Sequence, residues 1–146
     1  MAEIQSLRFS FYKITTDEFA LTGEKYDPAL NAEMSIGLGF NAMIEEKVVI
    51  IQVKCLFYQH GKLLIVIAVS CAFKVEDEDW NKIYHEENKS FELARHLALH
   101  MTSLTVGTAR GVLHAKTEKH IMNAVVVPPV NLNDIIKDDI KILQNQ

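Results

Sequence analysis

Residues 104–116, LTVGTARGVLHAK, combine two glycines with hydroxyl and basic side chains, the residue types that can hold a phosphate. A P-loop requires G-x-x-x-x-G-K-[ST] between a strand and a helix. Gly107 and Gly111 are instead four residues apart, no Lys-Ser/Thr pair follows, and a helical pattern precedes them. Glycine inside a helix costs roughly 1 kcal/mol relative to alanine. We therefore predict that both glycines thin the end of a helix, so that the sheet or a symmetry-related copy can pack closely against it.

A metal site is a second possibility, because Glu92, His96 and His100 follow one another at intervals of four residues. On a helix this spacing places the three side chains on one face. The motif H-E-x-x-H is absent, and His114 and His120 are the further candidates for a fourth ligand. We expect these histidines to lie on the surface or at an interface, without a metal.

Nucleophilic catalysis has little support in the sequence. Cys55 and Cys71 lie inside apolar stretches, where a thiol is normally inert packing. The nucleophile motif G-x-S-x-G is absent. We expect no enzymatic activity and no cofactor. One alternative is a small-ligand-binding α+β domain, in which Thr105, Thr108, Arg110 and His114 would line a pocket.

The composition favours a single cytoplasmic domain over residues 1–146. Of these residues 49% are apolar, enough for a substantial core. The net charge of −4, with no basic cluster, argues against nucleic-acid binding. The N-terminus lacks the pattern of a secretory signal, and the longest apolar run, residues 63–73, is too short to insert in a membrane.

Four stretches have the pattern of β-strands: residues 4–14, 33–40, 47–58 and 63–74. In the last two, the odd-numbered residues are apolar. Both sets share one face if the loop has an odd length, such as His60-Gly61-Lys62, which would place Cys55 beside Ile67 and Cys71 beside Ile51. The thiols would then be too far apart for a disulfide. The opposite face mixes apolar and polar residues, which indicates either covering helices or a surface that pairs with another chain.

An acidic connector, expected to be solvated, follows the fourth strand, and two helices follow the connector. The first would begin near Asn88 or Ser90 and end near His114. The second would begin at Asn131 or Asn133, after Pro128-Pro129. Its apolar stripe would be Leu132, Ile135, Ile136, Ile140 and Leu143. Strands followed by helices predict an antiparallel α+β domain.

The order of these elements resembles the bacterial protein-export chaperone family SecB. Met101-Thr102-Ser103-Leu104 and Arg110-Gly111 are similar to Ile-Thr-Ser-Met and Ser-Arg-Gly in the family's long helix, and residues 129–132, Pro-Val-Asn-Leu, are similar to its Pro-Val-Asn-Phe. Asp17 falls where the family has an acidic residue near the end of the first strand. The resemblance covers residues 5–145, although the 111–129 loop is longer than is usual in the family.

The resemblance implies a homotetramer, built as a dimer of dimers, without cofactor or catalysis. Family members hold unfolded client polypeptides in apolar grooves and pass them to the translocation motor SecA. His60-Gly61-Lys62 replaces the acidic residues that the family uses for docking on SecA, which leaves Asp17 and residues 76–79 as the acidic candidates. Some relatives instead serve as chaperones of antitoxins in toxin–antitoxin systems.

We therefore expect a SecB-like holdase that acts in preprotein export, with toxin–antitoxin association, small-ligand binding or a purely structural oligomeric subunit as alternatives. The expected client-binding residues are apolar side chains of the mixed sheet face and the C-terminal helix: Phe40, Ile50, Leu56, Tyr58, Leu132, Ile135 and Ile136. The expected oligomer interface is the stripe of the long helix: Ala94, Leu97, Met101, Leu104, Gly107, Thr108 and Gly111.

Overall fold

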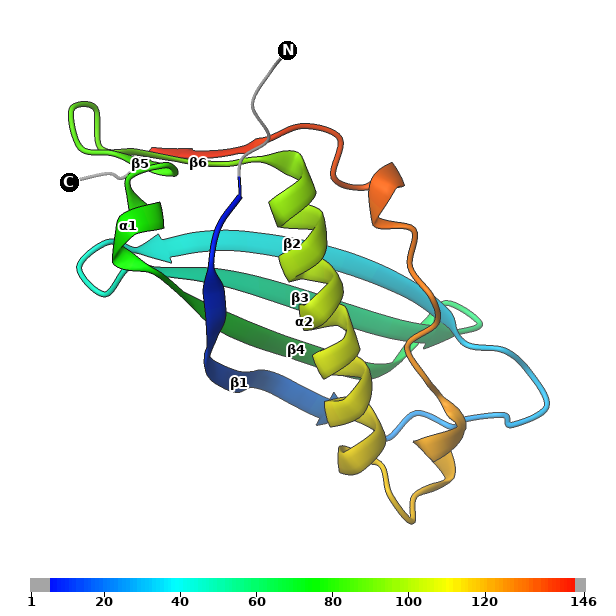
Figure 1. Cartoon of the computed structure of the whole chain (residues 1–146). Helices are drawn as coiled ribbons and strands as arrows, with labels where there is room; N and C mark the ends of the chain where they lie inside the picture. Colours follow the sequence, from blue (N-terminus) through cyan, green and yellow to red (C-terminus); the bar gives the residue numbers. More distant parts are fainter. Residues whose placement is uncertain (1–5, 144–146) are drawn as a thin grey trace.

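The computed structural model describes residues 6–143, which form two antiparallel sheets and a long helix (Figure 1). The larger sheet has the strand order β1-β4-β3-β2. Its strands are β1 (Phe9–Leu21), β2 (Glu33–Met43), β3 (Val48–Gln59) and β4 (Lys62–Val75). The predicted α+β class with a four-stranded antiparallel sheet is confirmed. Residues 4 and 5 of the predicted first strand lie outside the described residues, and β1 extends further than predicted, to Leu21.

The predicted register of β3 and β4 is confirmed, because Cys55 pairs with Ile67 and Cys71 with Ile51. The loop is shorter than expected. His60 and Gly61 form a two-residue turn with φ of 52° and 73°, the left-handed backbone that tight hairpin turns require. A bulge after this turn restores the register, since Phe57 pairs with Ile65 but Tyr58 pairs with Leu63. The odd-numbered residues of β3 therefore share one buried face.

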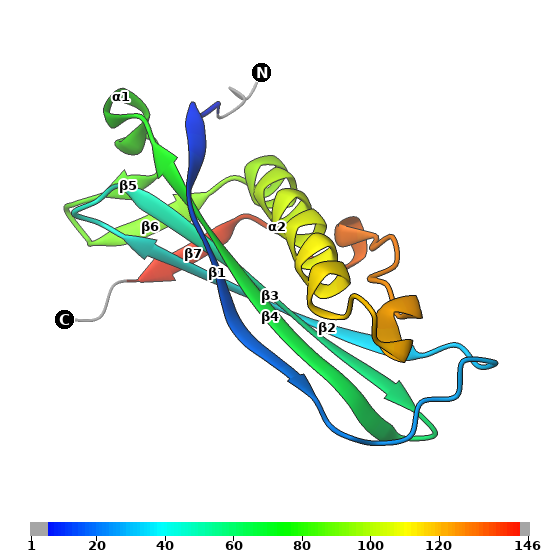
Figure 2. The same ribbon diagram turned by 90° about the horizontal axis from the view of Figure 1, so that it is seen from below.

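The long helix α2 (Arg95–Lys116) lies across that buried face, as Figures 1 and 2 show. We call the face under α2 the helix-side face. The other is the open face, which carries the even-numbered residues of β3: Ile50, Gln52, Lys54, Leu56 and Tyr58. Six apolar side chains of α2 are buried against the sheet: Leu97, Ala98, Met101, Val106, Ala109 and Leu113.

The start of α2 differs from the prediction, because the expected cap Asn88 precedes a strand and the expected cap Ser90 is the first residue of that strand. Ser90–Leu93 forms β6, and α2 begins at Arg95. The cap comes from a distant segment, since the Arg95 N–H donates to Asp139 Oδ1 at 2.7 Å. A carboxylate at this end satisfies a helix N–H and complements the helix dipole.

The predicted C-terminal helix is wrong. Leu132–Asp134 forms one turn of 3-10 helix (η2), and β7 (Ile140–Leu143) pairs with β6 in a small sheet of order β5-β6-β7. β5 is Tyr84–His85. Ile140 and Ile142 are half-buried while their neighbours are exposed, the alternation of a strand. Asparagine and aspartate are poor helix formers, so pairing with β6 decides the structure of this segment.

The acidic connector is solvated only in part. It contains a short helix, α1 (Asp77–Trp80), in which Asp79 and Trp80 are buried. The Asp79 carboxylate accepts hydrogen bonds from the Arg8 N–H at 2.9 Å and from Arg8 Nε at 3.0 Å. It also pairs with Lys82 Nζ at 2.9 Å. These contacts tie the chain just before β1 to α1, which follows β4.

Candidate apolar binding groove

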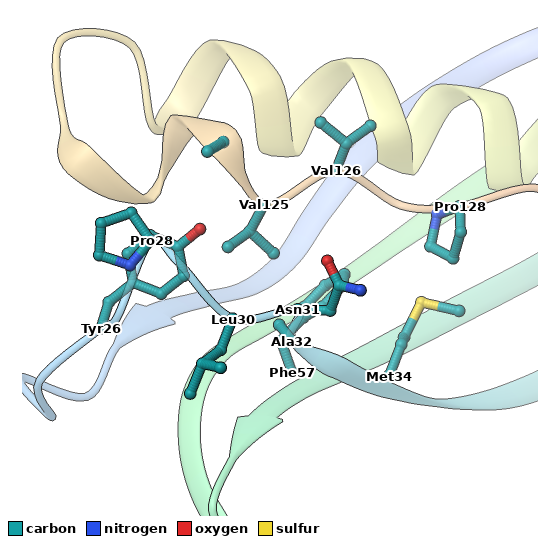
Figure 3. Close-up of a pocket in the computed structure, with 11 residues that line it drawn as sticks. Tyr26, Pro28, Leu30, Asn31, Ala32, Met34, Phe57, Val125, Val126 and Pro128 are labelled. Carbon is teal, nitrogen blue, oxygen red and sulfur yellow. The ribbon is translucent and has the colours of Figure 1, made fainter.

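An open groove of about 580 Å³ lies between the β1–β2 loop and residues 124–128, which run from the last residue of the 3-10 helix η1 (Ile121–Ala124) into extended chain. Figure 3 shows the two walls facing each other across the start of β2, the edge strand of the sheet. All lining residues except Asn31 have apolar or aromatic side chains: Tyr26, Pro28, Leu30, Ala32, Met34, Phe57, Ala124, Val125, Val126 and Pro128.

The side chain of Gln59 holds the first wall in place. This residue at the end of β3 is buried, and its amide makes three hydrogen bonds to the loop. Its Nε2 donates to the carbonyls of Asp27 and Leu30, both at 3.0 Å, and its Oε1 accepts from the Asp27 N–H at 2.9 Å. These hydrogen bonds therefore fix the conformation of the loop, and the apolar side chains of Pro28 and Leu30 line the groove.

Arg110 of α2 holds the second wall. Its Nε donates to the Val127 carbonyl at 2.7 Å and its Nη2 to the Pro128 carbonyl at 3.0 Å. Val125 and Val127 are buried beneath the segment while Val126 is exposed, as extended backbone requires. Sequence reasoning missed this wall, because every residue of the run AVVVPP is apolar and the sequence does not show which of the valines is exposed.

The groove offers a ligand apolar contact rather than charge. No ionisable side chain other than Tyr26 lines it, and the guanidinium of Arg110 is used by main-chain carbonyls. Its lining is open to solvent and lies beside a sheet edge. Such a site suits an extended apolar segment, because transfer of apolar surface from water drives binding and an edge strand can accept main-chain hydrogen bonds.

The structure does not bring the expected client-binding residues together. Ile50, Leu56 and Tyr58 are half-buried on the open face. Phe40 pairs with Ile51 and packs into the core on the helix-side face. Among the three residues of the supposed C-terminal helix, Leu132 and Ile136 are buried, and Ile135 is exposed. None of the seven lines the groove.

The centre of the open face is polar. Asp17 lies at a bulge of β1, and its carboxylate accepts hydrogen bonds from Ser70 Oγ of β4 and, at 3.0 Å, from Gln52 Nε2 of β3. The neighbouring Glu18 pairs with Lys54 Nζ at 3.1 Å. A hollow of about 420 Å³ adjoins this network. Polar contacts across three strands therefore divide the apolar residues of this face.

The expected interface stripe of α2 divides between core and surface. Leu97 and Met101 are buried against the sheet, whereas Gly107 and Gly111 are exposed. A Cβ placed on either glycine would meet no atom within 4 Å outside its own helix turn. The predicted close approach of the sheet is wrong, because both glycines lie on the far side of the helix. The three remaining stripe residues are half-buried: Ala94, Leu104 and Thr108.

The polar side chains of α2 do not converge on a ligand pocket. The hydroxyls of Thr105 and Thr108 donate to the carbonyls of Met101 and Leu104 in their own helix. Helix carbonyls and the main chain of residues 127–128 thus use the donors of three of the four residues that the small-ligand alternative required: Thr105, Thr108 and Arg110.

The buried Cys55 thiol is a poor nucleophile at neutral pH, because burial raises its pKa to about 11 although Arg110 opposes the shift. Within residues 6–143, no His, Cys, Asp or Glu residues cluster in a way that could hold a metal. No helix in the same part of the chain is both long and apolar enough to cross a bilayer.

Comparison of the chain with protein-family models, with curated proteins and with solved structures gives no match. Function must therefore be argued from the geometry of the groove and of the surfaces around it.

Proposed function

We propose that this chain is a holdase-type chaperone, similar to SecB, that binds non-native polypeptides in the groove between the β1–β2 loop and residues 124–128. The observation that carries the proposal is a fixed, open groove in which every lining side chain except that of Asn31 is apolar or aromatic, while polar groups make up about half of the exposed lining surface. An unfolded client offers apolar side chains and unpaired main chain rather than one defined shape. A groove beside a sheet edge can bind both.

The preformed walls support this function energetically. A site that must order itself loses part of its binding free energy, whereas the bonds of Gln59 and Arg110 hold both walls without a ligand. A holdase that binds the unfolded state delays folding and aggregation of the client by mass action. Neither step requires a cofactor or a chemical reaction.

An aggregation assay tests the proposal. A chemically denatured client is diluted into buffer with one molar equivalent of the protein, and light scattering is followed. We expect suppression by the unchanged chain and loss of suppression in Leu30→Asp and Val126→Asp. Both residues line the groove and are 42–51% exposed, so each aspartate places a charge at the rim of the groove without disturbing the core.

Ile121→Asp is the matched control, because Ile121 is 60% exposed but lies outside the groove lining. It should suppress aggregation as well as the unchanged chain does. The proposal fails if the unchanged chain leaves the scattering unaltered, or if all three variants behave alike.

The downstream partner is a separate part of the proposal. Asp17 lies on the open face, where a SecA-like motor could contact it, and an antitoxin is the alternative partner. A pull-down from native lysate that returns neither a SecA-like motor nor an antitoxin would contradict this part of the proposal.

A further inference from the structure

Asn31 is the one residue of the groove lining whose side chain is neither apolar nor aromatic. It is exposed, and its amide makes no hydrogen bond to any residue from 6 to 143. Figure 3 shows this amide near the middle of the groove, pointing into the space between the two walls. The donor Nδ2 and the acceptor Oδ1 are therefore free to bind a ligand that lies in the groove.

The main chain on either side of Asn31 is fixed. On the side of the loop, the carbonyl of Leu30 accepts from Gln59 Nε2 at 3.0 Å. On the side of the strand, Glu33 pairs with Tyr58 at the start of β2. Asn31 lies between these two anchors, so its amide is in place before a ligand arrives and little conformational freedom is lost on binding.

The opposite wall has few polar groups left for a ligand. The carbonyls of Val127 and Pro128 already accept from Arg110, at 2.7 Å and 3.0 Å, and Pro128 has no main-chain N–H. The other polar side-chain atom of the lining is the hydroxyl of Tyr26, which lies at one end of the groove in Figure 3. Asn31 is therefore the side chain that can bind a peptide group in the middle of the groove.

We propose that Asn31 binds the main chain of an extended client: its Nδ2 donates to a client carbonyl and its Oδ1 accepts from a client N–H. A carboxamide carries the same donor and acceptor groups as a peptide unit, so it can pair with both. The inference rests on the proposed function of the groove and names what the groove recognises there. Asn31 is a positioning residue, because pairing at one peptide unit orients the alternating client side chains relative to the apolar walls.

Recognition of the main chain lets one groove accept many sequences and still reject folded proteins. In a folded protein, nearly all buried main-chain N–H and C=O groups are already paired. An extended, unfolded segment carries unpaired groups whatever its side chains are. Burial of those groups between apolar walls without a partner costs free energy, and the Asn31 amide lowers that cost.

Methylation of the peptide main chain tests the inference. The probe is a short fluorescein-labelled peptide of alanine and leucine with one central tryptophan, chosen to favour a single register in the groove. Each peptide nitrogen is methylated in turn, which removes one N–H donor, and the dissociation constant is measured by fluorescence anisotropy. We expect one position at which the methyl group raises the dissociation constant about fivefold, as the loss of one hydrogen bond predicts.

The variant Asn31→Leu keeps the shape of the side chain and removes both hydrogen bonds. It should raise the dissociation constant of the unmethylated peptide about tenfold. It should also abolish the effect of the sensitive methyl group, because a double-mutant cycle between the two changes measures their contact. The affinity of this variant for an apolar dye without a peptide group should not fall.

Asn81→Leu is the matched control. Asn81 is also exposed, but it follows α1 and lies outside the groove lining. This variant should bind the peptide, its methylated forms and the dye as the unchanged chain does.

Two results would overturn this inference alone: a peptide that binds but has no methyl-sensitive position, or a methyl effect of equal size in the unchanged chain and in Asn31→Leu. Both would leave the holdase proposal standing, since the peptide still binds. If the unchanged chain binds neither the peptide nor the dye, the inference and the proposed function fail together.

Discussion

The amide of Gln59 is the contact on which the first wall of the groove depends, and Gln59→Met removes it with little change in volume. The three lost hydrogen bonds involve one main-chain N–H and two main-chain carbonyls. A buried hydrogen bond contributes a net of about 1 kcal/mol, and an unsatisfied buried group costs about 1–3 kcal/mol. We expect the free energy of unfolding to fall by about 2–4 kcal/mol if the loop stays in place, and by less if the loop lifts into water.

Two measurements separate these outcomes. Urea denaturation gives the change in the free energy of unfolding, and native-state hydrogen exchange reports the protection of the Asp27 amide, which donates to Gln59. If the loop stays in place, the free energy of unfolding falls by a large amount. If the loop lifts, the free energy of unfolding falls only a little and the amides of residues 24–31 exchange fast. In both cases, affinity for an extended apolar peptide should fall.

Gln52→Met is the matched control. The Gln52 amide makes one hydrogen bond, to Asp17 on the exposed open face. We expect the free energy of unfolding to change by no more than about 0.5 kcal/mol, as is usual for surface substitutions. If Gln59→Met also stayed within this range and the Asp27 amide kept its protection, the view that Gln59 fixes the groove wall would be refuted.

Two further predictions concern the helix and the pH dependence of stability. Gly107→Ala should raise the free energy of unfolding by about 0.5–1 kcal/mol, measured by urea denaturation, because the position is an exposed helix interior with free space around it; no gain would mean that Gly107 is covered in the folded protein. Asp79 should contribute to acid sensitivity, because its bonds to Lys82 and Arg8 hold the pKa of its carboxyl well below the ordinary value. Because the folded-state pKa is lowered, the ionised Asp79 carboxylate stabilises the fold above about pH 4, and this stabilisation is lost as the pH falls through and below that value. The variant Asp79→Asn should therefore have a lower free energy of unfolding at pH 7, and its free energy of unfolding should change less with pH in the acid range. An acid limb identical to that of the unchanged chain would contradict this role.

The central hairpin could be predicted from sequence because its signal is local and redundant. The odd-numbered residues are apolar from Val49 to Phe57 in β3 and from Ile65 to Val75 in β4, and only one register puts both sets on one face. The number of residues in the turn was not predictable in the same way. A two-residue turn with a bulge at Leu64 has the same effect on facing as a three-residue loop.

The C-terminal strand and the groove lacked such local signals. The spacing of Leu132, Ile136 and Ile140 fits a helix, and the actual choice depends on β6, almost 50 residues earlier in the chain. The groove walls depend on side chains that reach main-chain atoms 29–32 residues away, for Gln59, and 17–18 residues away, for Arg110. A glutamine or an arginine in a sequence does not by itself predict that it will hold a distant segment, so this role could be identified only from the folded structure.

The position of β1 in the sheet has a consequence for how the protein folds. β2, β3 and β4 follow one another through short turns, but β1 pairs with residues 44 positions (Leu21 with Ile65) to 66 positions (Phe9 with Val75) further along the chain. Closing that long loop is the entropically costly and slow part of assembling the sheet. During synthesis β1 is made first, and it has no strand to pair with until β4 has been made. A nascent chain therefore carries β1 unpaired until β4 has been made, which makes this stage of synthesis the period of greatest aggregation risk for this protein.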